Sequence, residues 1–254
     1  MNIYLFILII IIILIIIILL QNSNINNNIR NKFIEETKIT DNGRIIAMNG
    51  IDSNYYINFS RHYMLFNLLN VITRIFDENK IDYFLSCGAL LGYYRHNNGF
   101  IPWDDDIDIG VFEKDKDKII NILSQYTSLN TRYNFYKHDY DIYKFIFSNS
   151  FCDKTQIMVD LFFYKFYDDK NHYDLYTPMQ QFLFPREYIS NDELFPLING
   201  DFKLYLPDGI LYQICKVKIP NKSIDFLNRM FPGWKDKKIV SNVHNKMYKW
   251  LFNK

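Results

Sequence analysis

The stretch that most constrains this chain is CGALLGYYRHNNGFIPWDDDIDIGV, from Cys87 to Val111. Before it, an apolar strand-like run over 81–85 ends in a glycine turn, and a short helical pattern over 89–94 follows. Glycine at such a corner lets backbone N–H groups approach an anion closely, and the new helix adds its positive N-terminal end. The sequence therefore predicts a strand–turn–helix unit that can bind phosphate.

An acidic cluster follows at 104–108, and from Asp106 to Val111 apolar residues occupy every second position. Such alternation is the period of a half-buried strand, so Asp106 and Asp108 are expected on one face of a sheet. Adjacent carboxylates repel each other, and hard oxygen ligands of this kind suit Mg2+ or Mn2+. A phosphate-binding turn just before a metal-binding pair indicates chemistry on a phosphate ester or a nucleotide.

A third acid, Asp160, is the only charged residue in the alternating apolar segment 156–164. A buried carboxylate is costly unless it is paired or bound to a metal. We therefore predict that this strand lies beside the acidic strand, so that Asp106, Asp108 and Asp160 form one metal site and act as the catalytic residues.

The acidic cluster has two other interpretations, a calcium-binding loop and a solvated acidic turn. The residues from Asp104 onward match the first half of a calcium loop, but that loop needs glycine at its sixth position, where this chain has Ile109. A solvated acidic turn remains open for Asp104 and Asp105, because aspartate readily occupies turns.

Composition limits the class of protein. The formal net charge of +1 gives no basic excess of the kind that general nucleic-acid binders show, so no nucleic-acid partner is expected. Three cysteines make no disulfide framework. The remaining patterns predict helices over 61–78 and 114–126 and strands over 133–137 and 142–147, which indicates an α/β (α+β) fold.

The N-terminal part differs from the rest of the chain. Residues 3–20 are almost wholly apolar and uncharged, and this length approaches the ~20 residues that span a bilayer. We expect a transmembrane anchor over 1–20, a polar Asn-rich stem over 21–42 and one catalytic domain over 43–254. The flanking charges leave the orientation in the membrane open.

The central stretch resembles the LicD/fukutin family of the nucleotidyltransferase superfamily. The residues that carry the resemblance are Gly88-Ala89-Leu90-Leu91-Gly92, Arg95-His96, Gly99-Phe100-Ile101-Pro102-Trp103 and Asp104-Asp105-Asp106-Ile107-Asp108. At Ala89 the family usually carries serine or threonine. The resemblance implies a nucleotidyltransferase-like, mixed and mostly antiparallel sheet with flanking helices, and a short helix over 208–215.

The resemblance also implies an activity. A phospho-alcohol group, phosphocholine or ribitol or glycerol phosphate, would pass from a CDP-activated donor to a glycan hydroxyl with Mg2+ or Mn2+ as cofactor. The phosphate- or nucleotide-binding residues would be Gly88, Ala89, Arg95, His96 and Trp103. The implied location is the lumen of the secretory pathway, ER or Golgi, with a single-pass anchor in the membrane.

Two functions of other kinds remain as alternatives. Asp106-Ile107-Asp108 also matches the D-x-D motif of glycosyltransferases that use a nucleotide-sugar, although only one helix and one strand precede it. A non-catalytic, membrane-anchored accessory protein of glycosylation would keep the fold without the activity.

Overall fold

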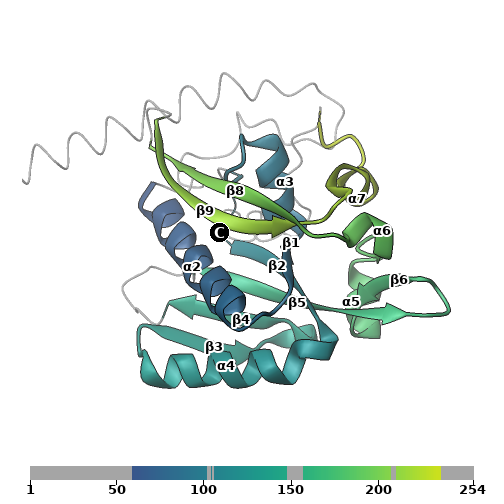
Figure 1. Cartoon of the computed structure of the whole chain (residues 1–254), viewed down its shortest axis with the longest axis horizontal. Helices are drawn as coiled ribbons and strands as arrows, with labels where there is room; N and C mark the ends of the chain where they lie inside the picture. The colour runs from purple at the N-terminus through teal and green to yellow at the C-terminus, as the bar shows by residue number, and fades with distance from the viewer. Residues whose placement is uncertain (1–58, 102–103, 105, 148–156, 207–209, 236–254) are drawn as a thin grey trace, which may run out of the picture. The chain divides into compact units, whose positions relative to one another are not determined.

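The computed structural model describes residues 59–101, 104, 106–147, 157–206 and 210–235 (Figure 1). Residues 60–204 and 212–237 form one compact unit. The second unit consists of 1–59, 205–211 and 238–254, most of which lies outside the described residues. The predicted anchor, the predicted stem, Trp103 and Asp105 are also outside the described residues.

The described part of the chain alternates between helices and strands. In order, the elements are α2 (Phe59–Glu78), β1 (Tyr83–Leu85), α3 (Cys87–Arg95), β2 (Asp106–Phe112), η3 (Glu113–Asp115), α4 (Lys116–Leu129), β3 (Tyr133–Lys137), η4 (Asp139–Asp141), β4 (Tyr143–Phe147), β5 (Met158–Tyr167), β6 (His172–Leu175), α5 (Pro178–Leu183), β7 (Ile189–Ser190), α6 (Asn191–Leu194), β8 (Ile198–Tyr205), β9 (Leu211–Ile219) and α7 (Ser223–Met230).

Seven strands form the main sheet, with β1-β2-β5-β4-β3 as its path and with β6 and β7 continuing from β5. Strands β2 and β5 run parallel, whereas the other described pairs of this sheet are antiparallel. Strands β8 and β9 pair separately as a two-stranded sheet. The predicted mixed, mostly antiparallel α/β architecture is therefore confirmed.

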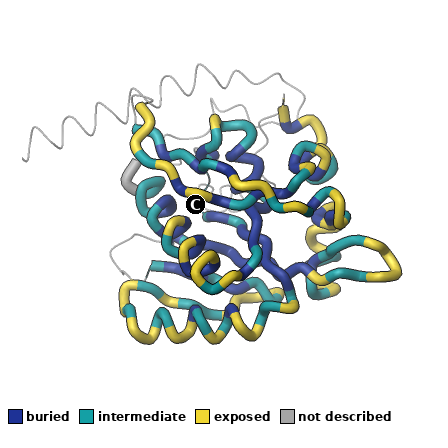
Figure 2. Tube along the Cα trace, in the orientation of Figure 1, coloured by how far each residue is buried: buried dark blue, intermediate teal, exposed yellow. Residues whose placement is uncertain are grey.

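The core lies between the central strands and helix α2. This helix buries an apolar stripe at helical spacing: Leu65, Leu68, Leu69, Ile72, Ile75 and Phe76. Figure 2 shows the central strands of the sheet in the colour of buried residues, whereas α4 and the β5–β6 turn carry many exposed positions. Strand β2 thus buries Ile107, Ile109 and Val111 completely, and the alternating aspartates are left on the opposite face.

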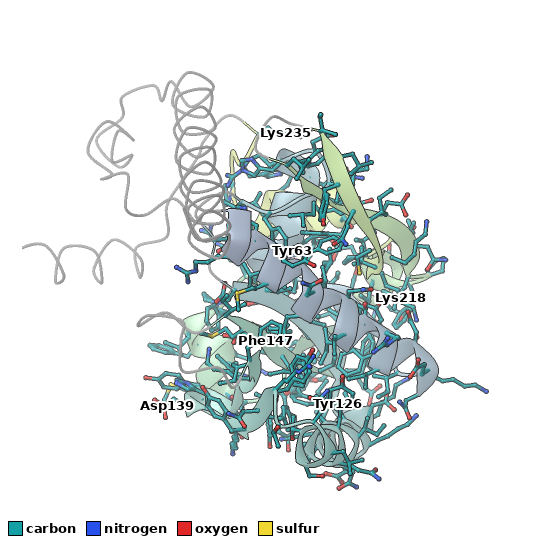
Figure 3. The ribbon with its side chains drawn as sticks, turned by 90° about the vertical axis from the view of Figure 1, so that its left-hand side faces the viewer. Tyr63, Tyr126, Asp139, Phe147, Lys218 and Lys235 are labelled. Carbon is teal, nitrogen blue, oxygen red and sulfur yellow. The ribbon has the colours of Figure 1, made fainter. Side chains whose placement is uncertain are left out.

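Strand β9 corrects one prediction. The expected short helix over 208–215 is wrong, because 211–219 is a strand. The residues Cys215, Val217 and Ile219 are buried, with lysines between them, which is the period of a half-buried strand. One of these lysines, Lys218 (labelled in Figure 3), lies 3.7 Å from both Asp77 and Asp82.

The predicted location as a single-pass membrane protein is wrong on the present findings. Across the part of the chain that the structure describes, no helix combines the length and the apolar character that crossing a membrane requires. The segment 3–20, on which that prediction rested, lies outside the described residues.

Candidate active site

The glycine turn and the acidic strand are in direct contact. Ser86, between β1 and α3, donates its backbone N–H to the Asp108 carbonyl at 3.1 Å, and Gly88 donates its N–H to Asp108 Oδ2 at 2.8 Å. A Cβ atom on Gly88 would lie 2.6 Å from Asp104 Oδ2 and 3.1 Å from Asp108 Oδ2. A side chain at this position would have to displace two carboxylates, because the backbone itself packs against them.

A row of charged residues crosses three adjacent strands. Asp108 of β2 stands opposite Asp160 of the parallel strand β5, and Asp160 stands opposite Lys144 of the antiparallel strand β4. Neighbouring strands lie about 4.8 Å apart, so register partners on one face meet side by side. Asp106 begins β2 two residues before Asp108, on the same face of the strand. The register therefore places Asp108 beside Asp160, and Asp106 lies further along the same face of β2.

Crowding of the acids changes the protonation of Asp108. Burial raises the pKa of the Asp108 carboxyl well above its ordinary 3.8, and the negative charges of Asp104, Asp160 and Glu187 raise it further. The hydrogen bond from the Gly88 N–H lowers the pKa in part, because it stabilises the ionised form. This carboxylate would be stabilised by a cation placed beside it.

Asp160 already has a cationic partner, the side chain of Lys144. The Lys144 ammonium donates to Asp160 Oδ1 and to Oδ2, both at 2.8 Å, and the two side chains are only 12% and 10% exposed. The ion pair with Lys144 thus offsets the free energy that is lost when the Asp160 carboxylate is removed from water. The sequence did not indicate Lys144, because its partner lies on another strand.

A buried glutamate is hydrogen-bonded to the residues of the glycine turn. Glu187 lies between α5 and β7 and is 1% exposed, and its Oε1 accepts hydrogen bonds from Ser86 Oγ (3.2 Å), Cys87 Sγ (2.6 Å) and Tyr164 OH (2.8 Å). Burial raises the pKa of the Glu187 carboxyl, and the three donors offset part of that rise. Because the Ser86 hydroxyl is used here, it does not cap helix α3.

These contacts also explain a strained backbone. Cys87 has a φ of 38°, in the left-handed region that non-glycine residues seldom adopt. Its bond to Glu187 Oε1 and the two hydrogen bonds of its neighbours to Asp108 hold it there. No local sequence signal marks Glu187, since it follows an irregular Pro-containing stretch, and only tertiary burial singles it out.

The other predicted residues lie along α3 or beyond it. Ala89 is 5% exposed in the first turn of α3. At the far end of the helix, Arg95 Nε donates to His96 Nε2 at 3.1 Å. Burial lowers the pKa of Arg95 to about 10, and the charge of Asp104 counteracts that fall, so the guanidinium stays charged at neutral pH.

The acids fit a divalent cation in their chemistry. Asp106 and Asp108 offer hard oxygen donors on one face, and a cation would balance the negative charge of Asp108 and its neighbour Asp160. Within the described ranges, no group of three or more His, Cys, Asp or Glu residues is already arranged to hold a metal ion. The ion pair with Lys144 occupies both oxygens of Asp160, the third predicted ligand.

Comparison with known proteins defines the class of this domain. Residues 80–205 match the family model described as LicD/FKTN/FKRP, nucleotidyltransferase domain. The description of that model places the matched part of the chain among domains that resemble nucleotidyltransferases. The resemblance to the LicD/fukutin family that the sequence predicted is confirmed by this match over residues 80–205.

Two relatives of known activity match parts of this chain at modest sequence identity. The lipopolysaccharide cholinephosphotransferase LicD of Haemophilus influenzae is 38% identical over 61 residues, which are 24% of this chain and 23% of that protein. The human ribitol-5-phosphate transferase FKTN is 30% identical over 105 residues, 41% of this chain and 21% of that protein. Both matches cover only a part of each protein.

A longer match is bacterial. An uncharacterized protein of Rickettsia prowazekii is 29% identical over 199 residues, 78% of this chain, and the match spans 65% of that protein. This relative gives no support to the predicted ER or Golgi lumen. Among solved structures, the lincosamide antibiotic adenylyltransferase LnuA with lincomycin bound has a TM-score of 0.39 at 15% identity, covering 74% of this chain and 97% of that one.

Proposed function

We propose that this protein transfers a phospho-alcohol group, such as phosphocholine or ribitol or glycerol phosphate, from a CDP-activated donor to a glycan hydroxyl. The observation that carries the proposal is the contact of the Gly88 turn with Asp108, which stands beside Asp160 on the neighbouring strand. The family match and the activities in the names of LicD and FKTN support the same chemistry.

The reaction needs little covalent help from the protein. The acceptor hydroxyl oxygen attacks the phosphorus that carries the alcohol, the bond from that phosphorus to CMP breaks, and CMP leaves while the hydroxyl loses its proton. The main requirements are therefore in-line placement of the hydroxyl and balance of the diphosphate charge.

We assign Asp106, Asp108 and Asp160 to an Mg2+ or Mn2+ site. When bound there, such a cation neutralises charge on the diphosphate oxygens. Asp160, which stands beside Asp108, would complete the cation site or accept the proton of the hydroxyl. Arg95 keeps a positive charge at the other end of α3 for a donor phosphate.

The test has two independent measurements. Purified protein is incubated with a panel of CDP-alcohols and nucleotide-sugars, with and without Mn2+, and released nucleotide is scored. Thermal unfolding with and without Mn2+ reports cation binding without any donor. We expect CMP release from a CDP-alcohol and a higher melting temperature with Mn2+.

Matched variants locate the site. Asp108→Asn and Asp160→Asn should each remove turnover and most of the Mn2+-dependent stabilisation. Asp169→Asn is the control, because Asp169 is an exposed carboxylate in the β5–β6 turn. Normal turnover and Mn2+ response in both Asp108→Asn and Asp160→Asn would place the chemistry elsewhere. Release from nucleotide-sugars alone would favour a glycosyltransferase, and a lack of release from every donor would favour an accessory protein.

A further inference from the structure

Lys144 lies next to Asp160 at the end of the row of acids, and the pairing of β4 with β5 fixes this position. It is the register partner of Asp160 across the antiparallel β4–β5 pair, as Asp108 is across the parallel β2–β5 pair. Its Nζ lies 2.8 Å from each Asp160 oxygen and 2.9 Å from Met158 Sδ. Because the Lys144 side chain is only 12% exposed, the ammonium is held against Asp160 and is largely removed from water.

The local charge balance explains why a lysine is useful there. The negative charges of Asp104 and Asp160 both act on Asp108, and burial strengthens their repulsion. The Lys144 ammonium reduces this negative charge by one without adding a metal ion. A buried carboxylate left without any cation would be strongly destabilising.

We propose that Lys144 is the built-in counter-ion of the row of acids, and that a divalent cation must take an Asp160 oxygen from it in order to bind. Lys144 is thus a positioning residue that pairs with Asp160 in the cation-free protein and limits the affinity of the site for the cation. This inference rests on the proposed function, because it assumes that the acids bind a divalent cation.

The bonding geometry permits this exchange. The ammonium has three protons and donates to the two Asp160 oxygens and to Met158 Sδ. With one Asp160 oxygen bound to a cation, Lys144 would keep its bond to the other oxygen and would have the released proton for a phosphate oxygen of the donor. Loss of the ion pair and binding of the cation are therefore coupled, and each should weaken the other.

Mn2+ binding measures the coupling directly. Electron paramagnetic resonance of free Mn2+ gives the dissociation constant without any donor or turnover. Lys144→Met removes the competing charge, so the dissociation constant should fall by about tenfold or more, as expected for a charge removed from a neighbouring buried position. The melting temperature without cation should fall, and the rise with Mn2+ should be larger than in the wild type.

Three further variants separate competition from a merely structural ion pair. Lys144→Gln, a second route if Lys144→Met does not fold, should also tighten Mn2+ binding. Lys144→Arg keeps the charge and should bind Mn2+ as the wild type does. Lys165→Gln is the control, because Lys165 is an exposed lysine on β5. Its Mn2+ affinity should not change.

The outcomes distinguish this inference from the proposed function. If the wild type binds Mn2+ and the folded Lys144→Met and Lys144→Gln variants bind it with unchanged affinity, the counter-ion role is overturned while the metal-dependent function stands. If neither the wild type nor these variants bind Mn2+, the metal site itself is refuted. Binding by the variants alone would support strong competition from Lys144.

Discussion

Gly88→Ala gives the sharpest test of the contact between the glycine turn and the acids. The added Cβ would lie 2.6 Å from Asp104 Oδ2 and 3.1 Å from Asp108 Oδ2, whereas ordinary contact begins at 3.4 Å. The Asp104 oxygen must therefore retreat by roughly 0.8 Å and the Asp108 oxygen by roughly 0.3 Å. The shift at Asp108 occurs at a carboxylate that the proposed chemistry uses, and Asp104 is a negative charge that acts on Asp108.

The fold should tolerate this change. Gly88 lies in the first turn of α3 and has no positive φ, so alanine fits the backbone there. The nearest atoms are the ends of side chains, which can move at small cost. Alanine also favours a helix over glycine by about 1 kcal/mol, which offsets the crowding. We expect the melting temperature without cation to be unchanged or slightly higher.

The function should not tolerate it. A displacement of about 1 Å in a positioned group can cost about a hundredfold in rate, so the smaller shift of roughly 0.3 Å at Asp108 should lower CMP release by about severalfold. The Mn2+ dissociation constant should rise, because the Asp108 carboxylate is displaced from its position beside Asp160. A folded Gly88→Ala variant with wild-type Mn2+ affinity and wild-type release would refute the reasoning.

Three other predictions concern stability and are measured by urea unfolding. Gly110→Ala places a Cβ 2.3 Å from the fully buried Phe84 ring, so the free energy of unfolding should fall by about 1–3 kcal/mol, and an unchanged midpoint would contradict this packing. Burial lowers the pKa of His62 from 6.5 to about 4, so its stabilisation is present above pH 6.5 and lost as the pH falls through about 4. His62→Phe keeps a ring against Phe100 and should flatten this decline, and an equal slope in both proteins would count against it. The raised pKa of Glu187 has the opposite sign, with stabilisation present below its ordinary 4.5 and lost as the pH rises through the raised value. Glu187→Gln should remove that loss, and parallel pH curves for the two proteins would argue otherwise.

Local patterns predicted much of the fold. Strand β3 (Tyr133–Lys137) has the predicted bounds, and α2, α3, β2, β4 and β5 differ from their predicted bounds by a few residues. Helix α4 starts at Lys116 because a 3-10 turn occupies 113–115. The incorrect helix over 208–215 came from the resemblance, although the alternation around Cys215 indicates the strand that the structure shows.

The sequence by itself determined which residues are suited to the chemistry. The glycine turn and the alternation around Asp106 and Asp108 are local features, because a few consecutive residues decide backbone approach and the face of a strand. The lone charge of Asp160 in an apolar strand was equally visible, since the cost of burying a carboxylate depends on its immediate surroundings.

Only the tertiary structure decided which groups meet. The pairing of β2 with β5 places Asp108 beside Asp160, although the two are far apart in the chain, and the pairing of β4 with β5 brings Lys144 to both oxygens of Asp160. Glu187 reaches the turn from a still later segment. Strand register and burial depend on long-range packing, and a one-residue slip of a strand would turn its charged side chain, Asp108, Asp160 or Lys144, to the other face.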